Sequence, residues 1–205
     1  MRDGKFVIPG VPYFSQRLDE DNWQSEGFQS IEEAKHWSAN LCGFTCLKMA
    51  IKTLFPDREM TLKELLDKGI EIGAYNDKVG AIHSGIVKLG ELYGLSGDRE
   101  SVGDSIEKIA RHIQNGQLVI ASITVGFEAG KEYVLKSGSK YVMPRGGHLV
   151  VIFGVEIESG EIKSFLLHHP SSEAGYEWMN YEISPSDLAR SLSQKGNIIY
   201  FNTRR

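Results

Sequence analysis

The first half of the chain repeats apolar residues at helical spacing. Side chains three or four residues apart form one face of a helix, and an apolar face packs on a core. Thr61 and Glu64 have the spacing of a capping box, which marks the start of a helix, and Ser30 and Glu33 repeat that spacing. The pattern predicts a short helix after residue 30 and further helices at about 40–55, 62–73, 81–93 and 103–114.

After residue 117 the pattern changes to short runs of β-branched and apolar residues. Such runs are typical of buried strands. Near the N-terminus, residues 7–16 are apolar but interrupted by prolines, which predicts an extended arm or an edge strand. Helices followed by antiparallel strands indicate an α+β fold. The expected strands are 118–124, 148–155, 162–169, 178–183 and 197–202, with a short helix opening at Ser184-Pro185.

The composition limits the possible partners and locations. The 205 residues suit one domain, or two small lobes around a shared cleft. A net charge of −4 provides no basic patch, so we expect no nucleic-acid partner. No apolar run approaches the roughly 20 residues that a membrane-spanning helix needs. The first residues lack the apolar core of a signal peptide, so the chain as written is expected in the cytoplasm. An export signal removed upstream would instead place it outside the cell or at its surface, and the oligomeric state is left open.

Cys42 is the first candidate for chemistry. It lies at the start of the helix predicted at 40–55, and a cap at Asn40 or Ser38 would place it in the first helical turn. Unpaired backbone N–H groups there stabilise an anion and can lower a thiol pKa from about 8.5 into the range of about 3.5–7.5. A nucleophilic thiolate is one interpretation, and an ordinary buried cysteine is the other. Cys46, one turn later on the apolar face, is predicted to be a core residue.

Two histidines are predicted to face one another on neighbouring strands. With Ser159-Gly160 as a two-residue hairpin loop, His148 lies opposite Ser171. His169 is then the diagonal neighbour of His148 on the same face, and His168 points to the other face. One imidazole could accept a thiol proton while the second holds its ring. Each histidine alone is also explained as a structural residue at the end of a strand.

A zinc site is another chemistry that these residues suggest. Cys42, Cys46, His148 and His169 carry the ligand atoms that zinc prefers. However, a CxxxC spacing is not a common structural zinc motif, and the histidines lie over 100 residues from the cysteines. We therefore expect no metal and no other cofactor.

Several motifs occur in the order found in one peptidase group. They are residues 11–16 (VPYFSQ), the pair Cys42-Gly43, residues 90–95 (GELYGL), residues 116–120 (GQLVI), residues 148–154 (HLVVIFG) and the pair His169-Pro170. With these motifs the chain resembles the double-glycine leader peptidase-like group of papain-like cysteine peptidases. The resemblance covers most of the chain and implies a papain-like fold in a single domain, residues 1–205. An N-terminal helical lobe, about 17–116, would pack against a C-terminal antiparallel β-sheet lobe, about 117–205 plus the arm 5–16.

The resemblance also implies roles for four residues. Cys42 would be the nucleophile and His148 the general base. Gln16 would donate its side-chain amide to the oxyanion. His169 stands before a proline where the family usually has an aspartate, and Phe44 stands where the family has a proline. A neutral histidine can orient His148 by hydrogen bonding, but it cannot stabilise the imidazolium electrostatically as a carboxylate does.

The implied function is a cysteine peptidase-like hydrolase. It would cleave a peptide or amide bond of a peptide or protein substrate through the Cys-His pair and a thioester intermediate. The histidine at position 169 leaves a second hypothesis open, a catalytically weak or inactive module of the same fold that binds an extended peptide. A third hypothesis is an acyltransferase that uses the same pair with an acceptor other than water. The three differ in the reactivity of Cys42 and in the product formed.

Overall fold

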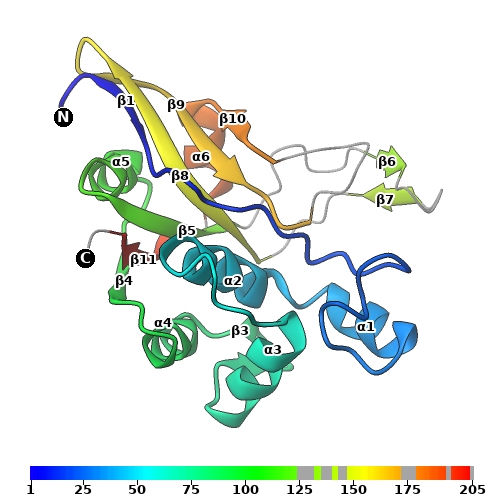
Figure 1. Ribbon diagram of the computed structural model, residues 1–205. Coiled ribbons are helices and arrows are strands. Elements are labelled where there is room, and N and C mark those ends of the chain that lie inside the picture. Colours follow the sequence, from blue (N-terminus) through cyan, green and yellow to red (C-terminus); the bar gives the residue numbers. More distant parts are fainter. Residues whose placement is uncertain (124–131, 135–139, 143–146, 172–178, 193–194, 204–205) are drawn as a thin grey trace.

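The helices predicted from the apolar spacing are present. The computed structural model describes residues 1–123, 132–134, 140–142, 147–171, 179–192 and 195–203 (Figure 1). In this part of the chain the helices are α1 (Ile31–Ser38), α2 (Cys42–Leu54), α3 (Leu62–Glu71), α4 (His83–Leu92), α5 (Ile106–Gln114) and α6 (Pro185–Ser191). Thr61 opens α3 with the full capping box, and the Ser30 side chain accepts a hydrogen bond from the N–H of Glu33 at the start of α1.

The strands form one antiparallel sheet and two short hairpins. Among the described residues they are β1 (Gly4–Val7), β2 (Tyr75–Asn76), β3 (Gly80–Ala81), β4 (Gly97–Ser101), β5 (Gln117–Ile123), β6 (Glu132–Val134), β7 (Lys140–Val142), β8 (His148–Glu158), β9 (Glu161–His168), β10 (Tyr181–Ile183) and β11 (Asn197–Asn202). The sheet has the order β10-β9-β8-β5-β11-β4, with β1 added along β8, and each pair is antiparallel. β2 pairs with β3 and β6 with β7. The α+β prediction is confirmed.

β8 is the central strand of the sheet. One edge pairs with β9, and the other edge pairs first with β5, through residues 148–152, and then with β1, through residues 154–157. Residues 149–155 are all buried, which explains why this strand is a continuous apolar run rather than an alternating one. His148 is the first residue of the strand and lies opposite Ile123 of β5, so the sheet fixes its backbone.

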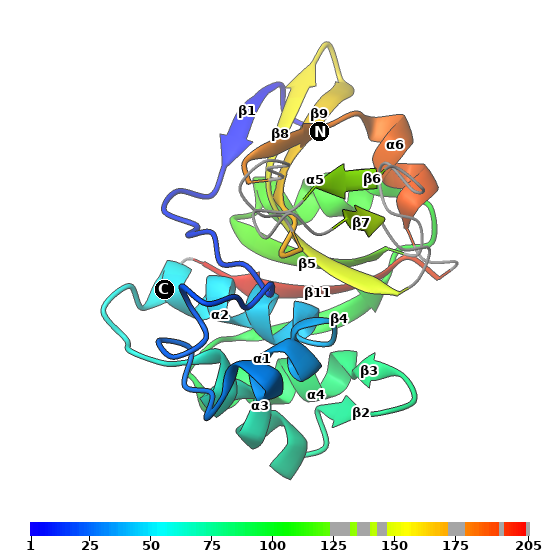
Figure 2. The ribbon, with the colours of Figure 1, turned by 90° about the vertical axis from the view of Figure 1, so that its right-hand side faces the viewer.

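Helices cover both faces of the sheet. Figure 2 shows α2 and α4 on one side of β5 and β11, with α5 and α6 on the opposite side. α2 is central to its layer, because it packs on β8, α3 and α4, and residues 43–51 are buried without exception. This burial makes α2 a rigid support for the cysteine at its first residue.

Some of the fold was not expected from the sequence. The N-terminal strand ends at Val7, so it lies ahead of most of the apolar segment 7–16. β4 lies in the part of the chain assigned to the helical lobe, about 17–116, between two expected helices, yet it forms an edge of the sheet by pairing with β11. Residues 124 and 178, the ends of two expected strands, lie outside the described residues. Within the described chain, no helix is long and apolar enough to cross a membrane.

Candidate active site

Cys42 is the first residue of α2 and lines a cavity of about 330 Å³. The residue at the cap position is Leu41, whose side chain makes no capping hydrogen bond. The expected cap at Asn40 or Ser38 is therefore wrong. Ser38 is the last residue of α1, and its hydroxyl donates to the backbone carbonyl of Gln16 instead, at 2.8 Å. The residue at the cap position of α2 thus leaves the N–H groups of the first turn without a side-chain capping bond.

Gly43 follows the cysteine because the start of α2 is tightly packed. A Cβ at this position would lie 2.5 Å from Cβ of Ala81 in β3 and 3.2 Å from Cδ1 of Leu149 in β8. A side chain would push the helix away from both strands. The glycine therefore keeps Cys42 close to the start of β8.

The pKa of the Cys42 thiol is raised, not lowered. The side chain is only partly exposed, and its burial is the largest influence because desolvation penalises the thiolate. Backbone N–H groups of Leu149, Gly43 and Cys42 itself lower the pKa, as does the positive charge of Arg17, but these effects are smaller. The stabilising effect expected from the N–H groups at the helix start is present, but the effect of burial on the pKa of Cys42 is larger.

His148 lines the same cavity as Cys42, from the start of β8. Its Nε2 is buried and makes no hydrogen bond within the described structure. Burial lowers the pKa of His148 to about 3, with a further contribution from the positive charge of Arg17. The imidazole is therefore neutral near pH 7.

His169 lies directly against His148, as the hairpin register predicted. The two rings stack with their centroids 4.5 Å apart and their planes 28° from parallel. β8 and β9 contain two irregularities, between Ile152 and Gly154 and again between Glu156 and Ile157, whose shifts cancel. The predicted register therefore returns at the histidine end, and the prediction that the two histidines share one face is confirmed.

The hydrogen bond to His169 identifies which ring nitrogen carries the proton. The backbone N–H of Ser171 donates to Nδ1 of His169 at 3.2 Å, so in the neutral ring the proton is on Nε2. The side chain is 1% exposed, and burial, the neighbouring His148 and Arg17 all hold its pKa well below the usual value. His169 is thus a neutral neighbour of His148.

Gln16 is anchored between the two halves of the site. Its backbone N–H donates to the carbonyl of Pro170 at 2.7 Å, directly after His169. Its side-chain Nε2 donates to the carbonyl of Ser38 at 2.8 Å, shortly before Cys42. The side chain is 1% exposed, and Oε1 is buried without a hydrogen-bond partner among the described residues. Nε2 keeps a second hydrogen that this bond does not use.

Arg17 is the site residue that the sequence reasoning missed. It follows Gln16, and its charge influences Cys42, His148 and His169 together. Its position beside a predicted oxyanion donor was the available signal. An arginine in a polar segment is indistinguishable from a surface residue until the fold brings the segment to the site.

Cys46 packs in the core as predicted. It is fully buried, and its thiol donates to the carbonyl of Leu149 at 3.4 Å. Burial and the neighbouring Cys42 raise its pKa well above the usual value. Across the residues that the structure describes, no group of three or more His, Cys, Asp and Glu side chains is placed to hold a metal ion.

Comparison with known proteins places this geometry in a family. Residues 8–192 match the Peptidase C39-like family. The fold is similar to that of a C39-like peptidase from Bacillus anthracis, with a TM-score of 0.60 and 17% identity over 98% of this chain and 99% of that chain. It is also similar to the peptidase domain of Streptococcus ComA, a bi-functional ABC transporter involved in quorum sensing, with a TM-score of 0.52 and 13% identity over 81% of this chain and 93% of that chain. No curated protein sequence matches the chain. The papain-like fold implied by the motifs is confirmed.

Proposed function

Because the chain belongs to the Peptidase C39-like family, which supports a cysteine peptidase-like function, we propose that it hydrolyses a peptide or related amide bond through Cys42. The observation that carries this proposal is that Cys42, at the start of α2, and His148, at the start of β8, line one cavity. The substrate is a peptide or protein segment, and no cofactor takes part. Residues 1–205 act as one domain, in which the helical lobe supplies the nucleophile and the β lobe supplies the base.

The reaction proceeds in two halves. Sγ of Cys42 attacks the carbonyl carbon while His148 takes the thiol proton, and the carbonyl oxygen becomes an oxyanion. The C–N bond then breaks, His148 gives its proton to the leaving amine, and a thioester remains on Cys42. In the second half water attacks the thioester, His148 takes a proton from it, and the acid leaves as the thiol is restored. Transfer to another acceptor would use the same first half, so identification of the product separates the two outcomes.

Gln16 and the backbone N–H of Cys42 are the proposed oxyanion donors. The Gln16 amide is buried and anchored to Ser38 by one hydrogen, which leaves the other for the substrate. A donor fixed before the substrate arrives needs no reorganisation during the reaction. The anchoring of Gln16 by two chain segments supports this role.

His169 acts as a positioning residue for His148. The Ser171 hydrogen bond fixes its tautomer, and the stacked rings restrict the rotation of His148. A carboxylate in this position would also stabilise the imidazolium, whereas neutral His169 does not. We therefore expect a slower enzyme than one with an aspartate here.

A catalytically inactive peptide-binding module is the second candidate. The raised pKa of Cys42 and the low pKa of His148 favour it, because together they keep the resting pair as a neutral thiol and a neutral imidazole. Such a pair attacks a carbonyl only if the proton moves during the attack. The two candidates therefore make opposite predictions for covalent labelling by a substrate-like electrophile.

The decisive experiment is labelling with peptide electrophiles. The purified chain is incubated with a panel of peptidyl vinyl sulfones, and intact mass and peptide mapping locate the adduct. The peptidase proposal expects saturable labelling of Cys42, which His148→Ala abolishes while Cys46→Ala leaves it intact. Equal, non-saturable labelling of Cys42 in the wild type and in His148→Ala would favour the inactive module.

A further inference from the structure

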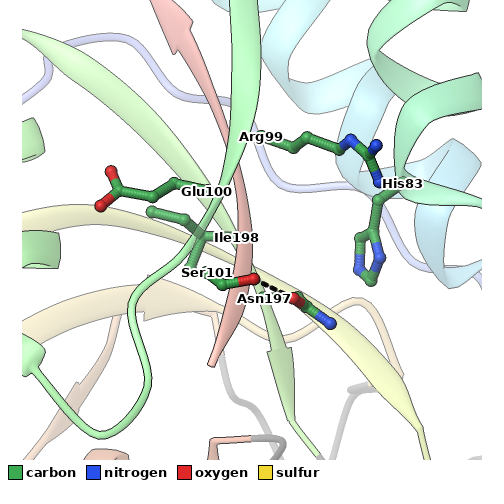
Figure 3. Close-up of a pocket in the computed structure, with 6 residues that line it drawn as sticks. All are labelled: His83, Arg99, Glu100, Ser101, Asn197 and Ile198. Carbon is green, nitrogen blue, oxygen red and sulfur yellow. Dashed lines mark hydrogen bonds between the residues drawn. The ribbon is translucent and has the colours of Figure 1, made fainter. Parts of the chain in front are cut away.

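A second cavity adjoins the catalytic one. Its volume is about 350 Å³, and its walls come from α4, β4 and β11: His83, Arg99, Glu100, Ser101, Asn197 and Ile198 (Figure 3). His83 also lines the cavity that contains Cys42 and His148. The two cavities therefore share His83 in their walls, and a peptide bound at Cys42 can extend toward the second one.

The second cavity is lined by one arginine and one glutamate, whose side chains point apart. Figure 3 shows the Arg99 side chain extending from β4 toward His83, while the Glu100 side chain points to the opposite side of the strand. Glu100 is already engaged there by Lys108 at 2.9 Å and by His112 at 3.1 Å. Within the described chain, Arg99 forms no ion pair. Its charge is therefore open to a ligand.

A hydrogen-bonding residue, His83, lies beside Arg99 in this cavity. The hydroxyl of Ser101 donates to Oδ1 of Asn197 at 2.8 Å, so these two side chains are already engaged with one another. His83 is the first residue of α4, whose start has no side-chain cap, so the partial positive charge of the helix end is not neutralised there. Nε2 of His83 is buried and makes no hydrogen bond among the described residues.

We propose that this cavity binds a carboxylate of the peptide substrate, with Arg99 as its charge partner and with His83 as a further hydrogen-bonding group. This inference rests on the proposed function and adds a substrate preference to it. An arginine fork matches a carboxylate with two parallel hydrogen bonds. The carboxylate belongs either to an acidic side chain of the substrate or to the C-terminus of a short peptide, since both offer the same chemistry.

Small probes test the cavity without requiring catalysis. N-acetylglutamate α-amide carries a side-chain carboxylate, N-acetylglycine carries a terminal one, and N-acetylglutamine α-amide carries none. Each is titrated into the ¹⁵N-labelled full chain, and the Arg99 Nε–H and His83 ring resonances are followed by NMR. We expect saturable shifts with one or both carboxylates, and the stronger of the two identifies the source. Arg99→Gln should weaken that binding about fivefold, the upper end of what an exposed charge-assisted pair contributes.

Arg111→Gln is the matched control, because Arg111 is an exposed arginine of α5, outside the cavity. Equal binding of all three probes, or an unchanged affinity in Arg99→Gln, overturns the proposal. In the kinetic arm, kcat/KM is compared within pairs of peptides that differ only by Glu against Gln, or only by a free against an amidated C-terminus. The difference within each pair should disappear in Arg99→Gln and remain in Arg111→Gln. If the chain cleaves and labels nothing, the peptidase proposal fails, while the NMR titration still decides the carboxylate site.

Discussion

The substitution His169→Asp tests the electrostatics of the candidate site directly. It places a carboxylate beside His148, where the motif comparison expects an aspartate. The N–H of Ser171, which now donates to Nδ1 of His169 at 3.2 Å, is available to hold the new side chain. His169→Asn has nearly the same shape without the charge, so the pair isolates the charge from the change of size.

The expected magnitude follows from the spacing of the two rings. Unit charges at the 4.5 Å separation of the His148 and His169 rings interact by about 4 kcal/mol at an effective dielectric constant of about 20. Since 1.4 kcal/mol corresponds to about one pH unit, the carboxylate should raise the pKa of His148 by about 2 to 3. The pKa of His148 should therefore rise from about 3 to between about 5 and 6.

The assay is an NMR titration of the histidine rings, supported by alkylation of Cys42. In the wild type the His148 ring signals should be constant from pH 5 to 8. In His169→Asp they should move with a midpoint between about pH 5 and 6. Iodoacetamide labelling of Cys42 in the wild type should accelerate only at alkaline pH, because burial raises the thiol pKa. His169→Asp should show faster labelling near pH 7 than His169→Asn.

Two results would refute this reasoning. The first is a wild-type His148 that titrates near its ordinary pKa of about 6.5, which would mean that burial does not control it. The second is identical titration curves for folded His169→Asp and folded His169→Asn, which would mean that the carboxylate does not act on His148. Thermal unfolding of each variant establishes that the comparison is made on folded protein.

Two further substitutions test the positioning of the site. Gly43→Ala should destabilise the fold by about 1–3 kcal/mol, because its Cβ would lie 2.5 Å from that of Ala81. Denaturant unfolding measures this against Gly147→Ala, whose added Cβ meets nothing within 4 Å, and equal losses would contradict the packing argument. Gln16→Ala should lower kcat by about 10²–10³ with little change in KM, as for loss of an oxyanion donor. Ser38→Ala removes the hydroxyl that holds the backbone of Gln16 but keeps the Gln16 amide and the carbonyl to which it donates, so an equal fall in kcat there would show that the loss comes from displacement of this segment and not from the missing amide.

The sequence predicted the parts of the fold that follow local periodicity. Apolar spacing located α2 to α5, and β-branched runs located β5, β8, β9 and β11. β4 could not be found in this way, because its residues 97–101 (GDRES) contain no apolar side chain. Its strand conformation comes from pairing with β11, a contact between segments about 100 residues apart. Such non-local pairing leaves no signal in a short window.

In the candidate site, too, local sequence signals predicted some features, and others depend on the whole fold. Alternation along a hairpin was sufficient to place His148 and His169 on one face, because two irregularities in β8 and β9 cancel. The pKa of Cys42 could not be predicted, because the helix-end field is local whereas desolvation depends on the whole fold around the thiol. Arg17 was missed for the same reason. Its effect depends on where the N-terminal arm lies, not on its sequence neighbours.

The positive charge of Arg17 acts on the site in two opposing ways. It lowers the pKa of Cys42 and so favours the thiolate, but it also lowers the pKa of His148 and His169 and so disfavours an imidazolium. A resting thiolate–imidazolium pair requires both ions at once, and a carboxylate at position 169 would stabilise the second of them. With a neutral histidine there, the proton of Cys42 has no stable resting place on His148. In the proposed reaction this proton must then be transferred while the sulfur attacks the carbonyl, and we expect the identity of residue 169 to decide between a resting ion pair and this concerted transfer.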